Sequence, residues 1–258
     1  MKKFNLEDKT LLVTGASSGL GKSLSRKAAE LGAHVYAASR NTEALDRLAD
    51  QSVKGVITPI QTDVRDLDSI KNLFEAIDKS RGSLDVVVNN AAVGHNSPIY
   101  ETGDGEVRKV IETNLMGTIY VTREAVSRML KQNDGQVVFV SSLAGKLAFP
   151  NLSVYSSTKF GIEGFAEAIS EELKDSGISI KTVRPGIMDT NFFAVAGMDD
   201  FARDMKEKMQ SPDEVADHVI QAIINRSTDV TIGTDKRFMP FLKHLPKALA
   251  RKILPYIT

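Results

Sequence analysis

The sequence predicts an α/β fold in which helices cover both faces of a doubly wound parallel sheet. Short runs rich in Val, Ile and Leu alternate regularly with longer stretches whose apolar residues recur at helical spacing. The short runs are nearly continuous in Val, Ile and Leu, which is typical of strands that helices bury on both faces. Hydrophobic residues make up 42% of the 258 residues, the ordinary balance of a globular protein.

Seven apolar runs predict the strands of this sheet. They lie at 10–15, 34–39, 55–63, 84–91, 135–142, 178–186 and 229–233. Amphipathic stretches between them predict helices at 20–31, 42–51, 66–80, 103–131 and 155–176. No linker, internal repeat or low-complexity tract interrupts these strand–helix units, so we expect a single domain over 1–258.

Charge and composition exclude several classes of protein. Lys and Arg together number 33, as do Asp and Glu, so no basic surplus points to a nucleic-acid partner. The absence of cysteine excludes disulfides and thiolate catalysis, and the four histidines lack metal-ligand spacing, so no metal site is expected. The sequence contains neither a signal-peptide pattern nor a run of about 20 apolar residues, and the expected location is cytoplasmic.

The glycine-rich loop "TGASSGLGKS" (14–23) follows the first predicted strand and allows two interpretations. A triphosphate-binding P-loop would need glycine at the position of Ala16, so this interpretation is disfavoured. A dinucleotide loop uses the glycines that are present. Gly15 would permit the tight turn, Gly19 the approach of a pyrophosphate, and Gly21 the packing of the next helix on the sheet. A glycine turn without any ligand stays open on this evidence alone.

Tyr155 and Lys159 in "YSSTK" are four residues apart, so a helix places them on one face. An ammonium group beside a phenol lowers the pKa of the phenol, and such a tyrosine can serve as a general acid or base. Taken alone, the pair could equally be a half-buried tyrosine beside a solvated lysine. Ser142, thirteen residues earlier at the end of a predicted strand, favours the catalytic interpretation.

Several further motifs occur in a fixed order along the chain. They are "TGASSGLG" (14–21), "DV" (63–64), "NNAA" (89–92), Asn114 in "ETNLMG", Ser142, "YSSTK" (155–159) and "RPGIMDT" (184–190). Together they resemble the short-chain dehydrogenase/reductase family, in its short single-domain branch, over roughly residues 9–190. The resemblance implies a Rossmann-type fold and an NAD(P)-dependent oxidoreductase that acts on carbonyl or secondary alcohol groups.

The resemblance also implies four catalytic roles. Tyr155 would exchange a proton with the substrate oxygen while hydride moves to or from the nicotinamide. Ser142 would hydrogen-bond that oxygen. Lys159 would lower the tyrosine pKa and bind the nicotinamide ribose, and Asn114 would hold a water that links Lys159 to solvent.

The same resemblance implies a set of cofactor contacts. Asp63 would contact adenine, Asn90 would brace the cofactor, and Thr190 would contact the nicotinamide amide or phosphate. The other implied contacts are Gly15, Ser17, Ser18, Gly19, Leu20, Gly21, Ser39, Arg40, Val64, Ala91, Ala92, Tyr155, Lys159, Pro185 and Gly186. Ala92 stands where the family usually has glycine, and we expect its methyl group to be tolerated.

The end of the second predicted strand bears on the choice of dinucleotide. Family members that use NAD commonly carry an acidic residue there, whereas this chain has Ser39 followed by Arg40. A hydroxyl and a guanidinium would bind the 2′-phosphate that an acid repels. NADP(H) is therefore predicted over NAD(H), although Arg40 could instead be a surface residue paired with Glu43.

The segment 190–210 is expected to form the loop over the active site. Its apolar residues are Phe192, Phe193, Val195, Met198, Phe201 and Met205. They predict a pocket for a small hydrophobic carbonyl compound or alcohol, although some could simply pack on the body of the fold. The alternative function is a catalytically silent NADP-binding sensor or scaffold, against which the intact Ser142, Tyr155 and Lys159 argue.

The C-terminal tail, 235–258, is basic, and Leu245, Leu249 and Ile253 fall on one helical face. Such a helix more often covers a subunit interface or the substrate mouth than an anionic membrane, so peripheral membrane contact is possible but not favoured. The resemblance implies a homodimer or homotetramer.

Overall fold

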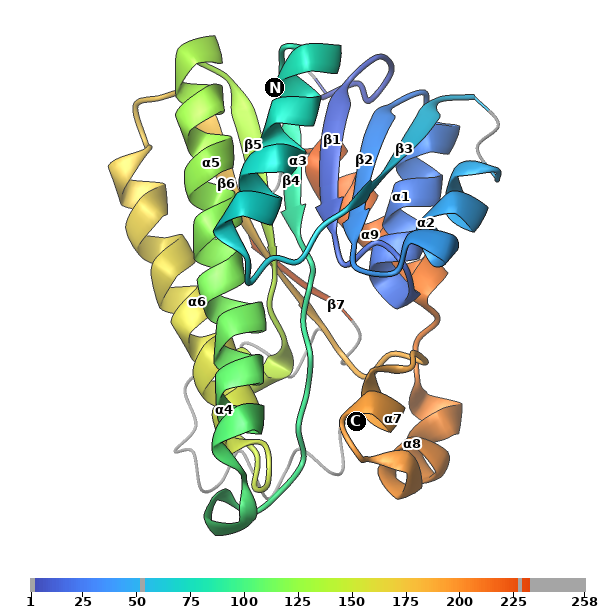
Figure 1. The fold of residues 1–258 in the computed structure, drawn as a ribbon, viewed down its shortest axis with the longest axis vertical. Coiled ribbons are helices and arrows are strands. Elements are labelled where there is room, and N and C mark those ends of the chain that lie inside the picture. Colours follow the sequence, from blue (N-terminus) through green and yellow to red (C-terminus); the bar gives the residue numbers. More distant parts are fainter. Residues whose placement is uncertain (1–2, 52–53, 227–228, 233–258) are drawn as a thin grey trace.

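The computed structural model describes residues 3–51, 54–226 and 229–232. A parallel sheet of seven strands runs through it in the order β3-β2-β1-β4-β5-β6-β7 (Figure 1). The strands are β1 Thr10–Thr14, β2 His34–Ser39, β3 Val56–Gln61, β4 Val86–Asn89, β5 Gly135–Val140, β6 Ile178–Pro185 and β7 Asp229–Ile232. The predicted doubly wound sheet is confirmed. Its strand order reverses between β1 and β4, the place where open α/β sheets bind ligands.

Helices cover both faces of the sheet, as Figure 1 shows. They are α1 Gly19–Glu30, α2 Thr42–Ala49, α3 Leu67–Ser80, α4 Asp104–Ile111, α5 Gly117–Gln132, α6 Ser153–Glu172, α7 Phe192–Val195, α8 Asp199–Met205 and α9 Pro212–Ile224. Apolar residues of α1, α2 and α9 form one core with the sheet, and those of α3, α5 and α6 form the other. Burial of the central strands on both faces explains why β1, β4 and β5 are almost entirely apolar.

Two features of the helices differ from the sequence-based prediction. The predicted helix 103–131 contains a π-helical segment, Glu112–Met116, between α4 and α5. The helix α9 was not predicted. Its N-terminus has a capping box, in which Ser211 Oγ accepts from Glu214 N at 3.1 Å and the Glu214 carboxylate accepts from Ser211 N at 3.0 Å.

Within the described ranges, no helix is long and apolar enough to cross a membrane. The predicted basic tail, 235–258, lies outside the residues that the structure describes.

Candidate active site

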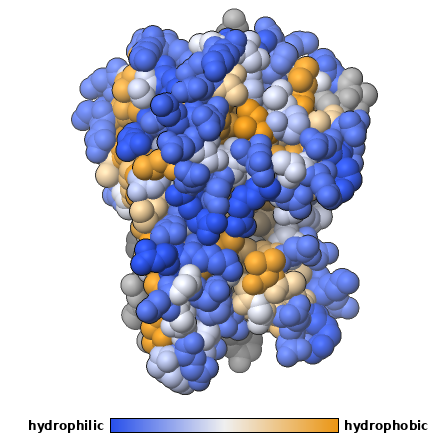
Figure 2. Space-filling model, in the orientation of Figure 1, coloured by the Kyte–Doolittle hydropathy of each residue, from blue (hydrophilic) through white to orange (hydrophobic). Residues whose placement is uncertain are grey.

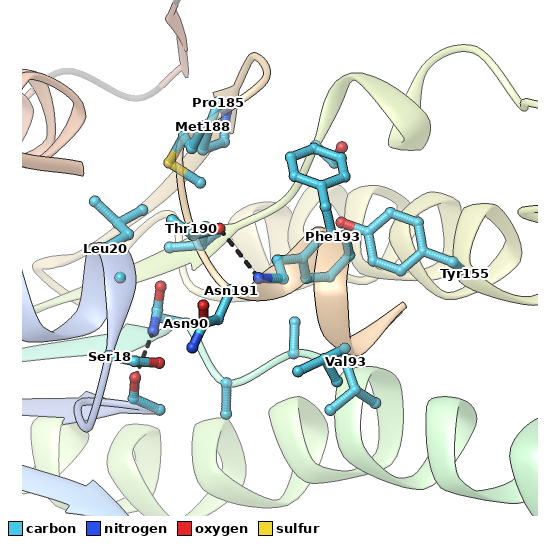
Figure 3. Close-up of a pocket in the computed structure, with 18 of the residues that line it drawn as sticks. Ser18, Leu20, Asn90, Val93, Tyr155, Pro185, Met188, Thr190, Asn191 and Phe193 are labelled. Atoms are coloured by element: carbon cyan, nitrogen blue, oxygen red, sulfur yellow. Dashed lines mark hydrogen bonds between the residues drawn. The ribbon is translucent and has the colours of Figure 1, made fainter. Parts of the chain in front are cut away.

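A cavity of about 760 Å³ lies at the carboxyl ends of the strands. The space-filling view shows the surface hollowed between the body of the sheet and the α7–α8 segment (Figure 2). Residues at or just after the carboxyl ends of six of the strands line the cavity. They are Gly15, Ser39, Asp63, Asn90, Ser142 and Gly186. Every site residue predicted from the sequence lines this cavity except Gly21 and Asn114. Figure 3 shows Ser18, Leu20 and Asn90 toward one end, and Tyr155 with Phe193 toward the other.

The glycine loop between β1 and α1 is compact. Gly15 has φ +66° and Gly19 has φ +50°, both in the left-handed region that favours glycine. A Cβ on Gly15 would lie 2.8 Å from the Cα of Ala91. A Cβ on Gly21 would lie 2.3 Å from the Gly15 carbonyl oxygen and 2.5 Å from Asn90 Nδ2. Gly21 therefore allows the first turn of α1 to lie close to the ends of β1 and β4, which agrees with the close packing of this helix on the sheet expected from the sequence.

Thr14 and Asn90 hold this loop in shape. Asn90 Nδ2 donates to the carbonyl oxygens of Thr14 at 2.9 Å and Gly15 at 3.2 Å. The Thr14 hydroxyl accepts from the backbone N–H groups of Asn90 and Ala91 at 3.0 and 3.1 Å. Asn90 thus braces the loop, whereas the sequence assigned it to the cofactor. Thr14 was not among the predicted site residues, although it is the first residue of the glycine motif.

We expect Gly21→Ala to destabilise the fold by about 1–3 kcal/mol, because the new methyl group would overlap the Gly15 carbonyl. Thermal unfolding should show a Tm lower by about 4–10 °C. The control is Gly164→Ala on the exposed side of α6, where no described atom lies within 4 Å of the added Cβ. Alanine favours a helix there, so its Tm should stay equal or rise. Equal Tm values for wild type and Gly21→Ala would contradict this account of the loop.

The P-loop interpretation finds no support in the residues that suggested it. Lys22 is exposed and does not line the cavity, and the Ser23 side chain hydrogen-bonds to Asp213 of α9. Both belong to α1, as the dinucleotide interpretation expects.

The end of β2 places two polar groups in the cavity. Ser39 Oγ donates to Ser17 Oγ at 2.8 Å, which joins the strand end to the glycine loop. Arg40 is exposed and lines the cavity beside it. In the described part of the chain, Glu43 pairs with Arg47 at 3.7 Å, and the expected alternative pair of Arg40 with Glu43 is not seen. Arg40 is thus directed to the cavity rather than engaged on α2.

Asp63 lines the cavity after β3, but its carboxylate is already engaged. Arg65 Nη2 donates to Asp63 Oδ2 at 2.6 Å, and Arg65 Nε lies 3.0 Å from Oδ1. These hydrogen bonds lower the pKa of Asp63, and the charge of Arg40 adds to the effect. The predicted adenine contact through the carboxylate would therefore have to compete with Arg65.

Tyr155, Ser142 and Lys159 all line the cavity. Tyr155 is 8% exposed, and burial raises the pKa of its phenol to about 12, while a hydrogen bond with Ser142 acts in the opposite direction. Lys159 Nζ donates to the carbonyl oxygen of Val140 at 2.8 Å and lies 5.7 Å from the centroid of the Tyr155 ring. Burial is the largest effect on the pKa of Tyr155, and the ammonium group of Lys159 bonds to Val140, so the lowering of that pKa by Lys159 stays a prediction.

Asn114 lies in the π-helical segment and is fully buried. Its Oδ1 accepts from Val93 N at 2.8 Å, and its Nδ2 donates to Val93 O at 2.9 Å and to Thr158 Oγ1 at 3.2 Å. The side chain therefore fixes the segment that follows β4 and reaches the residue next to Lys159. The water-holding role that the resemblance implies for Asn114 stays a prediction.

Ala92 has the place in which the family usually has glycine. Its φ is not among the positive values that the described residues show, so the backbone there needs no glycine. Ala92 lines the cavity with Ala91 and Val93, and the added methyl group is accommodated.

The far end of the cavity is apolar. All six residues predicted for this pocket line it, together with Phe149, Leu152, Ile187 and Met188. The rings of Tyr155, Phe192, Phe193 and Phe201 follow one another at centroid distances of 5.3, 5.6 and 5.5 Å. The segment 190–210 contains the helices α7 and α8 rather than an irregular loop. A Cβ on Gly94 would lie 2.7 Å from Phe192, so Gly94 makes room for this ring.

Two buried lysines should make stability depend on pH. Burial lowers the pKa of Lys159 and of Lys181 in β6 to about 8 each, against 10.5 ordinarily. Between about pH 8 and 10 the unfolded chain then binds more protons than the folded one, so the free energy of unfolding should rise with pH, by about 1 kcal/mol per pH unit for each lysine. Above about pH 10 the raised pKa of Tyr155 opposes the rise.

Denaturant titrations from pH 7 to 10 measure this slope. Lys181→Met should reduce it by about half, because Lys159 remains. If the free energy of unfolding of the wild type stays constant or falls with pH over this range, the lowered pKa values of the two lysines are contradicted.

Residues 9–200 match the model of the family described as short chain dehydrogenase. The chain belongs to the short-chain dehydrogenase family. It is an oxidoreductase of that family, as the motifs had predicted.

Similar proteins agree with this assignment. An uncharacterized oxidoreductase of Staphylococcus aureus (strain MW2) is 29% identical over 222 residues, which cover 86% of this chain and 94% of that protein. A short-chain dehydrogenase/reductase from Burkholderia phymatum, solved in complex with NAD, superimposes with a TM-score of 0.87 at 21% identity, over 98% of this chain and 96% of the other. A short-chain type dehydrogenase/reductase from Mycobacterium marinum gives a TM-score of 0.82 at 26% identity, over 88% and 95%.

Proposed function

We propose that this short-chain dehydrogenase transfers hydride between NADP(H) and a hydrophobic carbonyl compound or secondary alcohol, with Tyr155 as the general acid/base. One observation carries the proposal. A single cavity contains the glycine loop at the N-terminus of α1, the Tyr155–Ser142 pair and an apolar wall built by α7 and α8. A polar dinucleotide and an apolar substrate could thus lie end to end, with the tyrosine between them.

The residues present fit a dinucleotide. Ser18, the N-cap of α1, has an extended backbone and makes no side-chain capping bond to any described residue, and it lines the cavity together with Gly19 and Leu20 of the first turn. Ser17, Ser18 and Gly19 would hold the pyrophosphate there. Pro185, Gly186 and Thr190 would hold the nicotinamide end. When bound, the nicotinamide supplies or accepts the hydride.

The proton would move at the Tyr155 hydroxyl. With a pKa of about 12, the phenol is protonated near neutral pH and can donate a proton to a carbonyl oxygen that becomes an alkoxide. Ser142 would hold the same oxygen by a hydrogen bond. Lys159, on the same helix face, would stabilise the phenolate that remains, once its ammonium group exchanges the Val140 carbonyl for the ribose of the cofactor.

The proposal extends to the form in which the protein works. We expect a single catalytic domain that assembles as a homodimer or homotetramer in the cytoplasm and binds neither nucleic acid nor, preferentially, a membrane. Size-exclusion chromatography with light scattering, and vesicle flotation of the full chain against one that ends at Gly233, test the assembly and the membrane contact.

The function is tested by following NADPH oxidation at 340 nm against a panel of aldehydes and ketones, with NADP+ and the corresponding alcohols for the reverse direction. Apolar ketones should be preferred over substrates that carry a carboxylate or phosphate, because the pocket wall is apolar. Binding of NADPH without turnover of any compound would instead support the sensor or scaffold alternative.

A further inference from the structure

Glu163 lies one helical turn after Lys159 on α6 and forms a nearly buried ionic cluster. Its side chain is 9% exposed. Arg184 Nε donates to Oε1 at 2.7 Å and Nη2 donates to Oε2 at 2.5 Å, which makes a two-pronged ion pair. Lys146 Nζ lies 2.9 Å from Oε2 of the same carboxylate.

The two partners of Glu163 adjoin different walls of the active site. Lys146 follows the short helix Leu143–Gly145, which begins directly after Ser142. Arg184 is the residue before Pro185 and Gly186, which line the cavity. One carboxylate therefore joins the serine segment after β5, the lysine turn of α6 and the end of β6.

The packing around this cluster leaves little freedom. A Cβ on Gly145 would lie 2.7 Å from Ser141 Oγ, 3.0 Å from the Lys159 carbonyl oxygen and 3.2 Å from Glu163 Cγ. The serine segment is thus pressed against the Lys159–Glu163 turn. A shift of Glu163 cannot occur without a shift of the groups around Ser142.

We propose that Glu163 is a positioning residue of the active site, which fixes Ser142, Lys159 and the Pro185–Gly186 corner relative to one another and provides the negative charge that keeps Lys159 in its ammonium form. This inference rests on the proposed function of Tyr155 and Lys159. A buried ion pair contributes little net stability by itself, which is consistent with a role in geometry and charge rather than in stability.

The charges around Lys159 support the second part of this role. Among the described residues, Tyr155 and Glu163 face it from α6, and Arg184 and Lys146 face Glu163 from β6 and from the segment after β5. Burial lowers the pKa of Lys159 to about 8, and the charge of Glu163 works against this. Without that carboxylate, the cations of Arg184 and Lys146 would remain, and the pKa of Lys159 should fall further below 8.

The inference is tested with Glu163→Gln, which removes the charge and keeps the shape, and with Glu163→Asp, which keeps the charge. The pH profile of kcat is measured from pH 6 to 10 with NADPH and the best carbonyl substrate. For Glu163→Gln we expect kcat to fall about 10-fold at neutral pH. We also expect the decrease of kcat on the alkaline side of the profile to occur about one pH unit lower than in the wild type. In Glu163→Asp this decrease should return most of the way to its wild-type pH. Glu167→Gln, one turn further along α6 and exposed, should match the wild type.

A second measurement does not depend on turnover. In Glu163→Gln the rise in the free energy of unfolding with pH should begin about one unit below that of the wild type, because a lower folded-state pKa of Lys159 extends the interval in which the unfolded chain binds more protons. Absence of turnover in the wild type would count against the proposed function, while this shift would still support the role of Glu163.

The inference is overturned if Glu163→Gln changes neither the pH at which kcat decreases on the alkaline side nor the pH dependence of the free energy of unfolding. Glu163 would then be a structural residue, even if the variant had a lower Tm. If Glu163→Gln does not fold, Arg184→Lys replaces it as the test. This variant retains the cation but loses the two-pronged contact, and we expect a lower kcat with little change in KM. A wild-type kcat in Arg184→Lys would then reject the positioning role.

Discussion

Tyr155→Phe should abolish turnover, with kcat lower by at least about 10³-fold, while the affinity for NADPH stays within about threefold of the wild type. The substitution removes only the hydroxyl that bonds to Ser142. The ring keeps its contact with Phe192 and its place in the cavity wall. General acid/base catalysis contributes about 10²–10⁴-fold, so loss of the single proton-transfer group at this point of the cavity should remove that factor.

The rate is measured with the best substrate from the carbonyl panel, and binding by the change in NADPH fluorescence. Tyr120→Phe is the matched control, because it makes the same chemical change on α5 outside the cavity. It should retain wild-type kcat. If Tyr155→Phe keeps more than about a tenth of the wild-type rate, the proton must be transferred by another group, and the proposed role of Tyr155 is wrong.

The second large effect is expected from Ser39→Asp combined with Arg40→Leu, which should reverse the preference from NADPH to NADH. Arg40 lines the cavity at the end of β2, and Ser39 is held there by Ser17. A charge-assisted hydrogen bond contributes about 1.5–3 kcal/mol, so loss of the guanidinium should weaken NADPH by about 10–100-fold. The new carboxylate would repel the 2′-phosphate of NADPH and accept hydrogen bonds from the ribose hydroxyls of NADH.

The measured quantity is the ratio of kcat/KM for NADPH to that for NADH, at one ionic strength because exposed charges are screened by salt. The control is Arg47→Leu. It removes an arginine of α2 that pairs with Glu43 and does not line the cavity. The ratio in this control should equal that of the wild type. Equal Michaelis constants of the wild type for NADH and NADPH would contradict the predicted preference, and so would a double variant with an unchanged ratio.

Much of the fold could be predicted from the sequence, because the central strands are buried on both faces and each long helix on one. The helix α9 could also have been found, since Ser211, Pro212 and Glu214 form a capping box that is readable in the sequence. The π-helical segment around Asn114 could not. Its geometry depends on hydrogen bonds with Val93 and Thr158, which are distant in the sequence.

The site was predicted where its residues belong to short motifs. Tyr155 and Lys159 were placed on one helix face by their spacing, but their spacing says nothing of how deeply the phenol is buried, and burial determines its pKa. Glu163 and Arg184 belong to no common local pattern, because they meet only after α6 and β6 pack together. Ion pairs of this kind are a property of tertiary structure, and nothing in the sequence indicated that these two residues pair.

The hydrogen bonds between Asn90 and Thr14 have a consequence for protein engineering. They connect the ends of β1 and β4, the neighbouring strands at which the two halves of the sheet meet, although the two residues are 76 positions apart in the chain. The eight residues "TGASSGLG" therefore do not carry their own conformation. Grafted into another α/β protein, or expressed on a fragment that ends before β4, they would lack the asparagine that closes the turn and the backbone that limits Gly15. The transferable unit is the pair of adjacent strands with both of their loops.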